Sequence, residues 1–168
     1  MAKLRRRTPR SYATRCRATL GVLVQLFVEA EENVVIAAPF IQPDVLETGA
    51  LRASIRAALE REISIDLLGT KDDLSKRATR RLLTSFGPKL RLYHPAFPEF
   101  RMSRLGSHAK FCISDDKAAY IGSANLTNPG LSKHFELGVL VRGRVAASMR
   151  AFWNFAVHYR LFAELTDS

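Results

Sequence analysis

The sequence predicts an α/β fold in which a mixed central β-sheet is flanked by helices on both faces. Short apolar runs of strand length alternate with segments whose apolar residues recur at helical spacing. Residues 33–40 form an almost wholly apolar run, as expected of a strand buried on both faces of a sheet. The 168 residues suffice for one domain of ordinary size and are too few for two. We therefore expect a single domain over residues 1–168, with a basic, flexible leader at residues 1–11.

The first half of the chain predicts an initial helix followed by two strand–helix units. Four apolar residues with i, i+3, i+4 and i+7 spacing define the initial helix: Leu20, Leu23, Val24 and Phe27. After the strand at 33–40, Asp44 and Glu47 have the spacing of a capping box. One apolar helical face follows: Leu51, Ile55, Ala58 and Leu59. Alternating apolar residues at 63–67 predict the second strand.

The next helix is predicted to begin at Asp72-Asp73 and to end at Gly87-Pro88. Its inward residues are Leu74, Ala78 and Leu82. The outer side carries four basic residues, which form either a solvated face or a surface for nucleic acid: Lys76, Arg77, Arg80 and Arg81.

The second half of the chain predicts four further strands, at about residues 90–93, 109–114, 117–121 and 137–142. The loop at 94–107 carries Arg101 and Arg104, and a tight hairpin turns at Asp115-Asp116. A long final helix is expected from about Val145 to Leu165, and its apolar stripe predicts four core residues: Met149, Phe152, Trp153 and Ala156.

The charge of the chain is its most unusual bulk property. The 26 Lys and Arg residues exceed the 16 Asp and Glu residues by ten. Such an excess favours a polyanionic partner, either nucleic acid or an anionic membrane surface, although a merely soluble basic protein remains an alternative. The arginines of the leader, Arg5, Arg6 and Arg7, form either an anion-binding arm or a solvated tail.

Cysteine content and hydropathy favour the cytoplasm. Cys16 and Cys112 are too few for a disulfide scaffold, which fits a reducing compartment. No run approaches the roughly 18 apolar residues that suggest a membrane span, so no integral membrane association is expected. The basic start followed by an apolar segment resembles an export signal, but it continues into Glu29–Glu32 without a small-residue cleavage site. We expect a structural first helix and a cytoplasmic protein.

The residues between His108 and Asn125 carry the chemical information. His108 and Lys110 are two apart on a predicted strand, so their side chains leave the same face. An imidazole beside an ammonium is a poor site for a metal cation and a good site for an anion, and it suits a nucleophile that attacks phosphorus. The return strand ends at Gly122-Ser123-Ala124-Asn125, which brings a hydroxyl and a carboxamide back toward His108.

These positions resemble the signature of the phospholipase D superfamily. The chain reads His-x-Lys, four residues, Asp, six residues, Gly-Ser-x-Asn from His108 to Asn125, with every fixed position matched. Glu136 is similar to the acidic residue that family members place shortly after the motif, and the upstream segment at 37–41 resembles the end of the family's first unit. The resemblance covers most of the chain and implies the family's α/β/α sandwich.

The resemblance also implies roles for the motif residues. His108 would attack phosphorus to give a phosphohistidine, Lys110 and Asn125 would hold the non-bridging oxygens, and Ser123 would donate a further hydrogen bond. Glu136 would accept from the far ring nitrogen of a catalytic His108. Gly122 belongs to the motif, and Asp115, at the other end of the strand, is expected to be structural and to bind backbone groups of the turn. No metal and no other cofactor is expected, because lysines supply the positive charge.

The mechanism needs a second histidine to protonate the leaving oxygen and later activate water. Full-length family members carry two motifs and this chain carries one, since His94, His134 and His158 lack a Lys two residues later. We expect His134 and His158 to lie in a loop and on a helix surface. The economical solution is a C2 homodimer in which two His108 side chains meet, an arrangement that resembles the family's small single-motif nucleases.

Three functions remain open. The first is a dimeric, metal-independent nuclease acting on DNA in preference to RNA. The second is a phospholipid hydrolase, with residues 97–100 dipping into a membrane interface. The third is a nucleic-acid-binding subunit whose site is slow or silent within a larger defence complex, whose other subunits would be its partners. The cytoplasmic, single-motif form is similar to the phospholipase D-like component of the anti-phage DISARM system, so a role in anti-phage defence is also expected of the nuclease. Cys112 would either line the pocket or fill the core.

Overall fold

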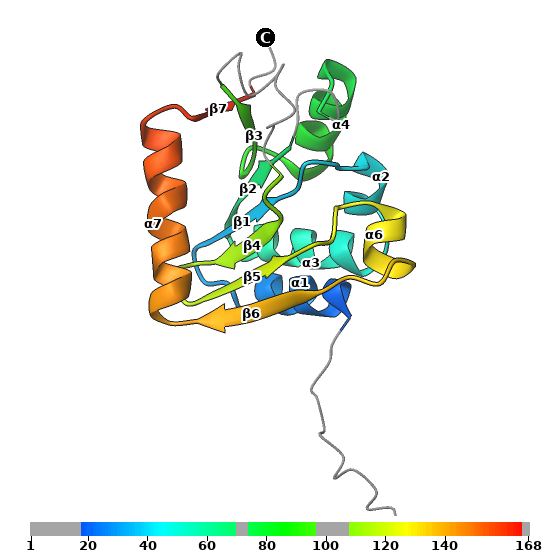
Figure 1. The fold of residues 1–168 in the computed structure, drawn as a ribbon. Helices are drawn as coiled ribbons and strands as arrows, with labels where there is room; N and C mark the ends of the chain where they lie inside the picture. The colour runs from blue at the N-terminus through cyan, green and yellow to red at the C-terminus, as the bar shows by residue number, and fades with distance from the viewer. Residues whose placement is uncertain (1–17, 70–73, 97–107, 166–168) are drawn as a thin grey trace, which may run out of the picture.

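The computed structural model describes residues 18–69, 74–96 and 108–165. Seven strands form one sheet in the order β6-β5-β4-β1-β2-β3-β7 (Figure 1). The strands are β1 (Asn33–Ala37), β2 (Ser64–Leu68), β3 (Leu90–Pro95), β4 (Phe111–Ser114), β5 (Ala118–Gly122), β6 (Gly138–Arg142) and β7 (Phe162–Glu164). The strands β1, β2 and β3 are parallel, and every other pairing is antiparallel, so the predicted mixed sheet is confirmed.

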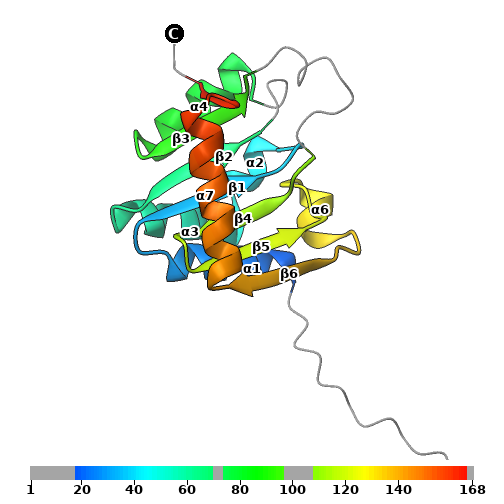
Figure 2. The ribbon, with the colours of Figure 1, turned by 60° about the vertical axis from the view of Figure 1, so that its left-hand side comes forward.

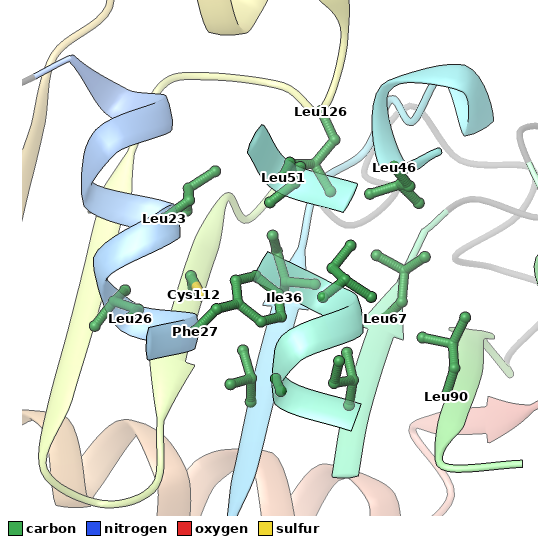
Figure 3. Close-up of a cluster of buried hydrophobic side chains, with 14 of the residues drawn as sticks. Leu23, Leu26, Phe27, Ile36, Leu46, Leu51, Leu67, Leu90, Cys112 and Leu126 are labelled. Atoms are coloured by element: carbon green, nitrogen blue, oxygen red, sulfur yellow. The ribbon is translucent and has the colours of Figure 1, made fainter. Parts of the chain in front are cut away.

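Helices lie on both faces of this sheet, as predicted. They are α1 (Thr19–Glu29), α2 (Pro43–Leu46), α3 (Gly49–Glu60), α4 (Lys76–Phe86), α6 (Asn128–Ser132) and α7 (Arg144–His158). α7 crosses one face, while α1 and α3 lie against the other (Figures 1 and 2). The α1 face holds the larger core, in which side chains from α1 and α3 meet those of the sheet (Figure 3). Among the described residues, α7 alone supplies helix side chains to the core of the opposite face.

A buried carboxylate helps to fix α7 on the sheet. Asp66 of β2 is only 2% exposed and accepts hydrogen bonds from Arg91 Nε at 2.7 Å and from Trp153 Nε1 of α7 at 3.0 Å. The Trp153 ring packs at right angles to Tyr93 and stacks on Phe162. Burial, together with the nearby Asp66 charge, raises the pKa of Tyr93 to about 12. The tryptophan thus combines a large apolar contact with a satisfied polar group.

Several local predictions are wrong in the N-terminal half. The buried residues of α1 are Val22, Leu23, Leu26 and Phe27, so its core face is rotated from the predicted stripe, because α1 contacts α3 as well as the sheet. No capping box forms at Asp44, because the chain makes two helices there. Asp44 lies inside α2, and Thr48 precedes α3 and donates from Oγ1 to the Asp44 carbonyl at 2.8 Å.

The basic helix α4 begins later than predicted. Ser75 is its N-cap and accepts from the Ala78 N–H, whereas the predicted start at Asp72-Asp73 lies outside the described residues. Thr79 and Leu82 are buried, and Ala78 is only half-buried. Gly87, with φ of 82°, ends the helix as predicted.

The C-terminal half shows two further corrections. The final helix does not reach Leu165: Arg160 adopts φ of 57° after His158, and the chain turns to form β7 beside β3. Phe152, predicted to lie in the core, is 54% exposed. The strand boundaries shift by a few residues, and the short helix α6 was not predicted. Arg101 and Arg104 of the predicted loop lie outside the described residues.

Candidate functional site

His108 and Lys110 lie just before β4, which begins at Phe111, two residues later than the predicted strand at 109–114. The N–H of Gly122 donates to the Lys110 carbonyl at 3.1 Å, which continues the β4–β5 pairing past the strand ends. Lys110 Nζ donates to the His108 carbonyl at 3.2 Å. The His108 side chain is exposed and that of Lys110 is half-buried, so both groups are available at the surface.

Phe40 is the one side chain found in ring contact with His108 within the described residues. The two ring centroids are 6.4 Å apart and the planes are nearly perpendicular. Although Phe40 is 52% exposed, its backbone is fixed: its carbonyl accepts from the Leu126 N–H, and the Gln42 N–H donates to the Leu126 carbonyl. This pairing joins the segment after β1 to the segment after β5. Sequence reasoning missed Phe40, because its position depends on this long-range pairing.

Ser123 and Glu136 form a hydrogen-bonded pair between β5 and β6. Ser123 Oγ donates to Glu136 Oε2 and accepts from the Leu137 N–H at 3.1 Å, and the Ser123 N–H donates to the Leu137 carbonyl at 3.0 Å. Glu136 Oε1 also lies 3.9 Å from His134 Nδ1. In the part of the chain that the structure describes, Glu136 makes no hydrogen bond to its own His108.

Asn125 is half-buried and follows Ser123 after β5. Its Oδ1 is buried without a hydrogen-bond partner among the described residues. Its amide also carries a donor, Nδ2, which suits an external acceptor. Such a donor suits an anion, as does the ammonium of Lys110.

Asp115 lies at the far end of β4 from His108. Its carboxylate accepts from the N–H groups of residues 31, 32 and 33, at 3.0, 2.9 and 2.9 Å, rather than from the hairpin turn. Burial opposes the charge, but the hydrogen bonds from Asn33 and its two predecessors, with the nearby Lys117, outweigh burial and lower the pKa of Asp115. Asp115 thereby joins the β4–β5 hairpin to the start of β1.

The motif glycine, Gly122, is required by packing. Gly122 pairs with Gly138 on β6, and a Cβ at either position would overlap the Tyr120 ring. Tyr120 is buried, and its hydroxyl lies 3.2 Å from Thr19 Oγ1 at the start of α1. The Tyr120 ring therefore packs against the adjoining ends of β5 and β6, next to Ser123.

Cys112 does not line the site. It is fully buried in the larger core, where burial raises the pKa of its thiol. His134 is an exposed loop residue and His158 is exposed at the end of α7, as predicted. Among the described residues no group of three or more His, Cys, Asp or Glu side chains is placed to hold a metal ion.

The basic residues of α4 lie on the same side of the molecule as the site. All four basic residues of α4 reach the surface, and Arg81 is ion-paired with Asp44 and Glu47. A shallow cavity of 440 Å³ separates α4 from the segment that follows Phe40, and its polar lining includes Gln42, Ser75 and Asn128. The predicted leader arginines, Arg5, Arg6 and Arg7, lie outside the described residues. No described helix is both long and apolar enough to cross a bilayer.

Comparisons with known proteins identify a family and a fold. A family model described as "cardiolipin synthase, PLD-like domain" matches residues 23–155. No curated protein sequence gives a significant match. Among solved structures, the chain is similar to Nuc, a phospholipase D family member from Salmonella typhimurium, with a TM-score of 0.63 and 17% identity over 86% of this chain and 89% of Nuc.

Two other solved structures have the same fold. NucT from Helicobacter pylori matches with a TM-score of 0.64 and 18% identity over 83% of this chain and 87% of NucT. The phosphatidylserine synthase of Haemophilus influenzae matches with a TM-score of 0.64 and 14% identity, over 86% of this chain but 36% of the synthase. The seven-stranded sheet and its flanking helices are thus shared by proteins of very different sequence.

Proposed function

Because the chain belongs to the family of phospholipase D-like domains, we propose that it is a metal-independent phosphodiesterase that cleaves nucleic acid. One observation carries the proposal: His108, Lys110, Ser123, Asn125 and Glu136 gather at the adjoining ends of β4, β5 and β6. Together they supply a nucleophile, a cation, an amide donor and a carboxylate that accepts from the Ser123 hydroxyl, and these groups suit phosphoryl transfer. Since the Ser123 hydroxyl donates to Glu136, its expected donation to the substrate is not seen.

The proposed reaction has two displacements. A ring nitrogen of His108 attacks phosphorus, a P–N bond forms, and the P–O bond to the leaving oxygen breaks. A second histidine donates a proton to that oxygen, then takes a proton from water as the water oxygen attacks and the P–N bond breaks. Lys110 Nζ and Asn125 Nδ2 hold the non-bridging oxygens throughout.

The second histidine is proposed to be the partner subunit's His108 in a C2 homodimer. The position of Glu136 supports this assignment: its carboxylate is held by Ser123 and makes no hydrogen bond to His108 of the same described chain. It is therefore available to the partner subunit's His108, whose tautomer it would fix. The alternative acid within one chain is His134, 3.9 Å from Glu136.

Nucleic acid is the proposed substrate because of charge. The chain carries a net charge of +10, and α4 presents Lys76, Arg77 and Arg80 at the surface near the cavity that adjoins Phe40. Rows of Lys and Arg bind phosphates along a backbone without reading sequence. A phospholipid substrate is the second candidate; exposed apolar side chains next to Ser123, Ile121 and Leu137, favour it. A defence role is supported by the sequence resemblance alone, and plating of phage on cells with and without the gene would test it.

The test is a turnover assay with DNA, RNA and phosphatidylcholine vesicles in excess EDTA. Wild-type protein is expected to cleave a nucleic acid, and His108→Ala is expected to lower turnover by about 10³-fold or more, since it removes the nucleophile. The matched control is His158→Ala, at the far end of α7, which is expected to retain full activity. Cleavage that stops in EDTA and returns with magnesium would contradict metal independence, and cleavage of phosphatidylcholine alone would replace the nuclease by the second candidate.

A further inference from the structure

Phe40 and Gln42 lie close together on a short segment after β1 that pairs with Leu126. The Phe40 carbonyl accepts from the Leu126 N–H at 3.1 Å, and the Gln42 N–H donates to the Leu126 carbonyl at 2.8 Å. Side chains two apart on such an extended backbone leave the same side, about 6–7 Å from each other. Ile41, between them, is 3% exposed and belongs to the larger core, whereas Phe40 and Gln42 are both exposed. The segment therefore presents a ring and an amide together at the surface.

The Phe40 ring offers an aromatic surface beside the proposed phosphate-binding groups. It is 52% exposed, and among the described residues its ring contact is with His108, nearly perpendicular and 6.4 Å away between centroids. Its backbone partner Leu126 directly follows Asn125. An exposed aromatic side chain is a platform on which unpaired bases stack, whatever their sequence. A base on Phe40 would thus belong to a nucleotide next to the phosphate that His108 attacks.

The side chain of Gln42 supplies a hydrogen-bond donor at the same place. Its Oε1 accepts from the Asn128 N–H at the start of α6, at 2.9 Å, which fixes the oxygen end of the amide. The other end, Nε2, is a donor for which the described part of the chain holds no acceptor. Gln42 also lines the cavity in front of α4, whose 440 Å³ lies within the range of about 300–1,000 Å³ of small-ligand sites.

The far side of this cavity is basic. Ser75 and Ala78, at the start of α4, line it there, and Lys76 and Arg77 are exposed on the same turn of the helix. Figure 1 shows the segment after β1 leading into α2, which lies between α4 and α6. Phosphates on both sides of a bound base would therefore meet cations, Lys110 on one side and α4 on the other.

We propose that Phe40 and Gln42 form a subsite for one unpaired nucleobase next to the phosphate that is cleaved. This inference rests on the proposed function and names the part of the substrate that Phe40 binds. The base stacks on the Phe40 ring, and Gln42 Nε2 donates to a ring nitrogen or a carbonyl oxygen at its edge. A base within a duplex is stacked on both faces, so the subsite takes a base from a single strand or one that is drawn out of a helix.

The test compares a single-stranded thymidine oligonucleotide with an abasic oligonucleotide of the same length, which has the same phosphates and no bases. Dissociation constants are measured by fluorescence anisotropy in EDTA, in a His108→Ala background that prevents cleavage. The ratio of the abasic constant to the thymidine constant reports on base binding alone, because phosphate contacts and changes in stability affect both constants.

Three substitutions are placed in this background. Phe40→Leu removes the ring but keeps an apolar side chain, Phe40→Tyr keeps the ring, and Gln42→Met removes the amide at similar length. The matched control is Phe155→Leu on α7, because Phe155 is 51% exposed, almost the same as Phe40. The melting temperature of each variant is measured as well.

The abasic oligonucleotide is expected to bind at least about fivefold more weakly than the thymidine oligonucleotide. Phe40→Leu and Gln42→Met should bring this ratio toward one, while Phe40→Tyr and Phe155→Leu should preserve it. A ratio of one before any substitution at Phe40 or Gln42, or a ratio that Phe40→Leu leaves unchanged, would overturn the subsite. So would a Phe40→Leu variant that binds both oligonucleotides equally less well, since Phe40 would then act on the phosphate groups.

A separate cleavage assay with His108 intact distinguishes the subsite from the proposed function. Cleavage together with a ratio of one would leave the phosphodiesterase standing and remove the subsite. Base-dependent binding that Phe40→Leu abolishes, without cleavage of any phosphodiester, would support the subsite and remove the enzyme. Binding of phosphatidylcholine vesicles in place of either oligonucleotide, lost in Phe40→Leu, would overturn the proposal in favour of a lipid headgroup, whose trimethylammonium group an aromatic ring also attracts.

Discussion

His108 and Gly122 show that the motif combines chemical and steric requirements. His108 is exposed, and among the described residues its ring contacts that of Phe40, whereas Gly122 is constrained by close packing. The glycine is fixed because Tyr120 fills the space that a side chain would occupy. The sequence predicted His108 and Lys110 as site residues from their types and their spacing alone, and the structure places them at the surface beside the start of β4. Phe40 was not evident, because its contact with His108 depends on the hydrogen bonds between its own carbonyl and Leu126.

Gly122→Ala is expected to destabilise the protein by about 1–3 kcal/mol, because the added methyl overlaps the buried Tyr120 ring and forces it to move. Urea unfolding followed by circular dichroism would measure the change. The matched control is Gly21→Ala in α1, where a Cβ meets no atom within 4 Å and helix propensity favours alanine by up to about 1 kcal/mol. Equal stability of Gly122→Ala and wild type would show that Tyr120 moves aside without cost.

Asp115 is expected to contribute stability that depends on pH. Its folded pKa is lowered, so its contribution is complete above its unfolded pKa of about 4 and is lost as pH falls through the lower folded value. Asp115→Asn should therefore be less stable than wild type at pH 7, and the difference should shrink below about pH 4. Thermal melts between pH 2 and 7 would measure this, with the exposed Asp116→Asn as control. A difference that stays constant with pH would mean that the charge of Asp115 is unimportant.

At the scale of the element, short sequence patterns correctly predicted most of the features that depend on neighbouring residues alone. The turn residues predicted the β4–β5 hairpin, Gly87 predicted the end of α4, and the apolar run predicted the central strand β1, and all three predictions are confirmed. The end of α7 was wrong because β7 is stabilised by β3, far away in the sequence. The apolar stripe of α7 was predicted to lie wholly in the core, because a sequence does not show which apolar residues of a helix the sheet covers; Phe152 is 54% exposed.

Asp66 contributes to the attachment of α7 beside the apolar contacts of that helix. Asp66→Ala would leave Trp153 Nε1 without its acceptor and Arg91 without its ion pair. We expect a loss of about 1–3 kcal/mol, since a buried donor loses its partner, while the half-exposed Arg91 regains water. The urea midpoint and the near-ultraviolet circular dichroism of Trp153 would report it, and Asp116→Ala, at an exposed carboxylate, is the control. An unchanged aromatic spectrum would show that the ring contacts alone hold the helix.

At the scale of the whole molecule, two features matter most. The chain carries a single motif, and the described chain leaves several apolar side chains uncovered. The single motif led to the prediction that the second histidine comes from another chain, whereas the sequence did not show which apolar side chains the fold leaves exposed. The reason is physical: Ile121, Val139 and Phe152 have the composition of core residues, and only the arrangement of α7 over the sheet shows that nothing in the described chain covers them.

Mixing of subunits tests the shared site. Equal amounts of wild type and His108→Ala, after exchange, give about one quarter wild-type dimers, one half mixed dimers and one quarter mutant dimers. A mixed dimer has one His108 and lacks either the nucleophile or the acid, so activity per total protein should fall to about a quarter of the wild-type value. Native mass spectrometry verifies exchange. An activity near one half would mean that each chain carries a complete site, and loss of activity in His134→Ala would then identify His134 as its acid.

The hydrogen bond between Thr19 and Tyr120 has a consequence for anyone who attaches something to this protein. Thr19 begins α1 directly beneath β5, whereas Leu165 donates its N–H to Leu92 beside the edge strand β7. With about 4.8 Å between neighbouring strands, β5 and β7 lie about 24 Å apart across the sheet. A dye or fused domain joined at the start of α1 is therefore tethered close to the proposed phosphate-binding groups, where we expect it to report on substrate or to obstruct it. The same group joined after β7 is held at the far edge of the molecule and leaves the proposed site uncovered.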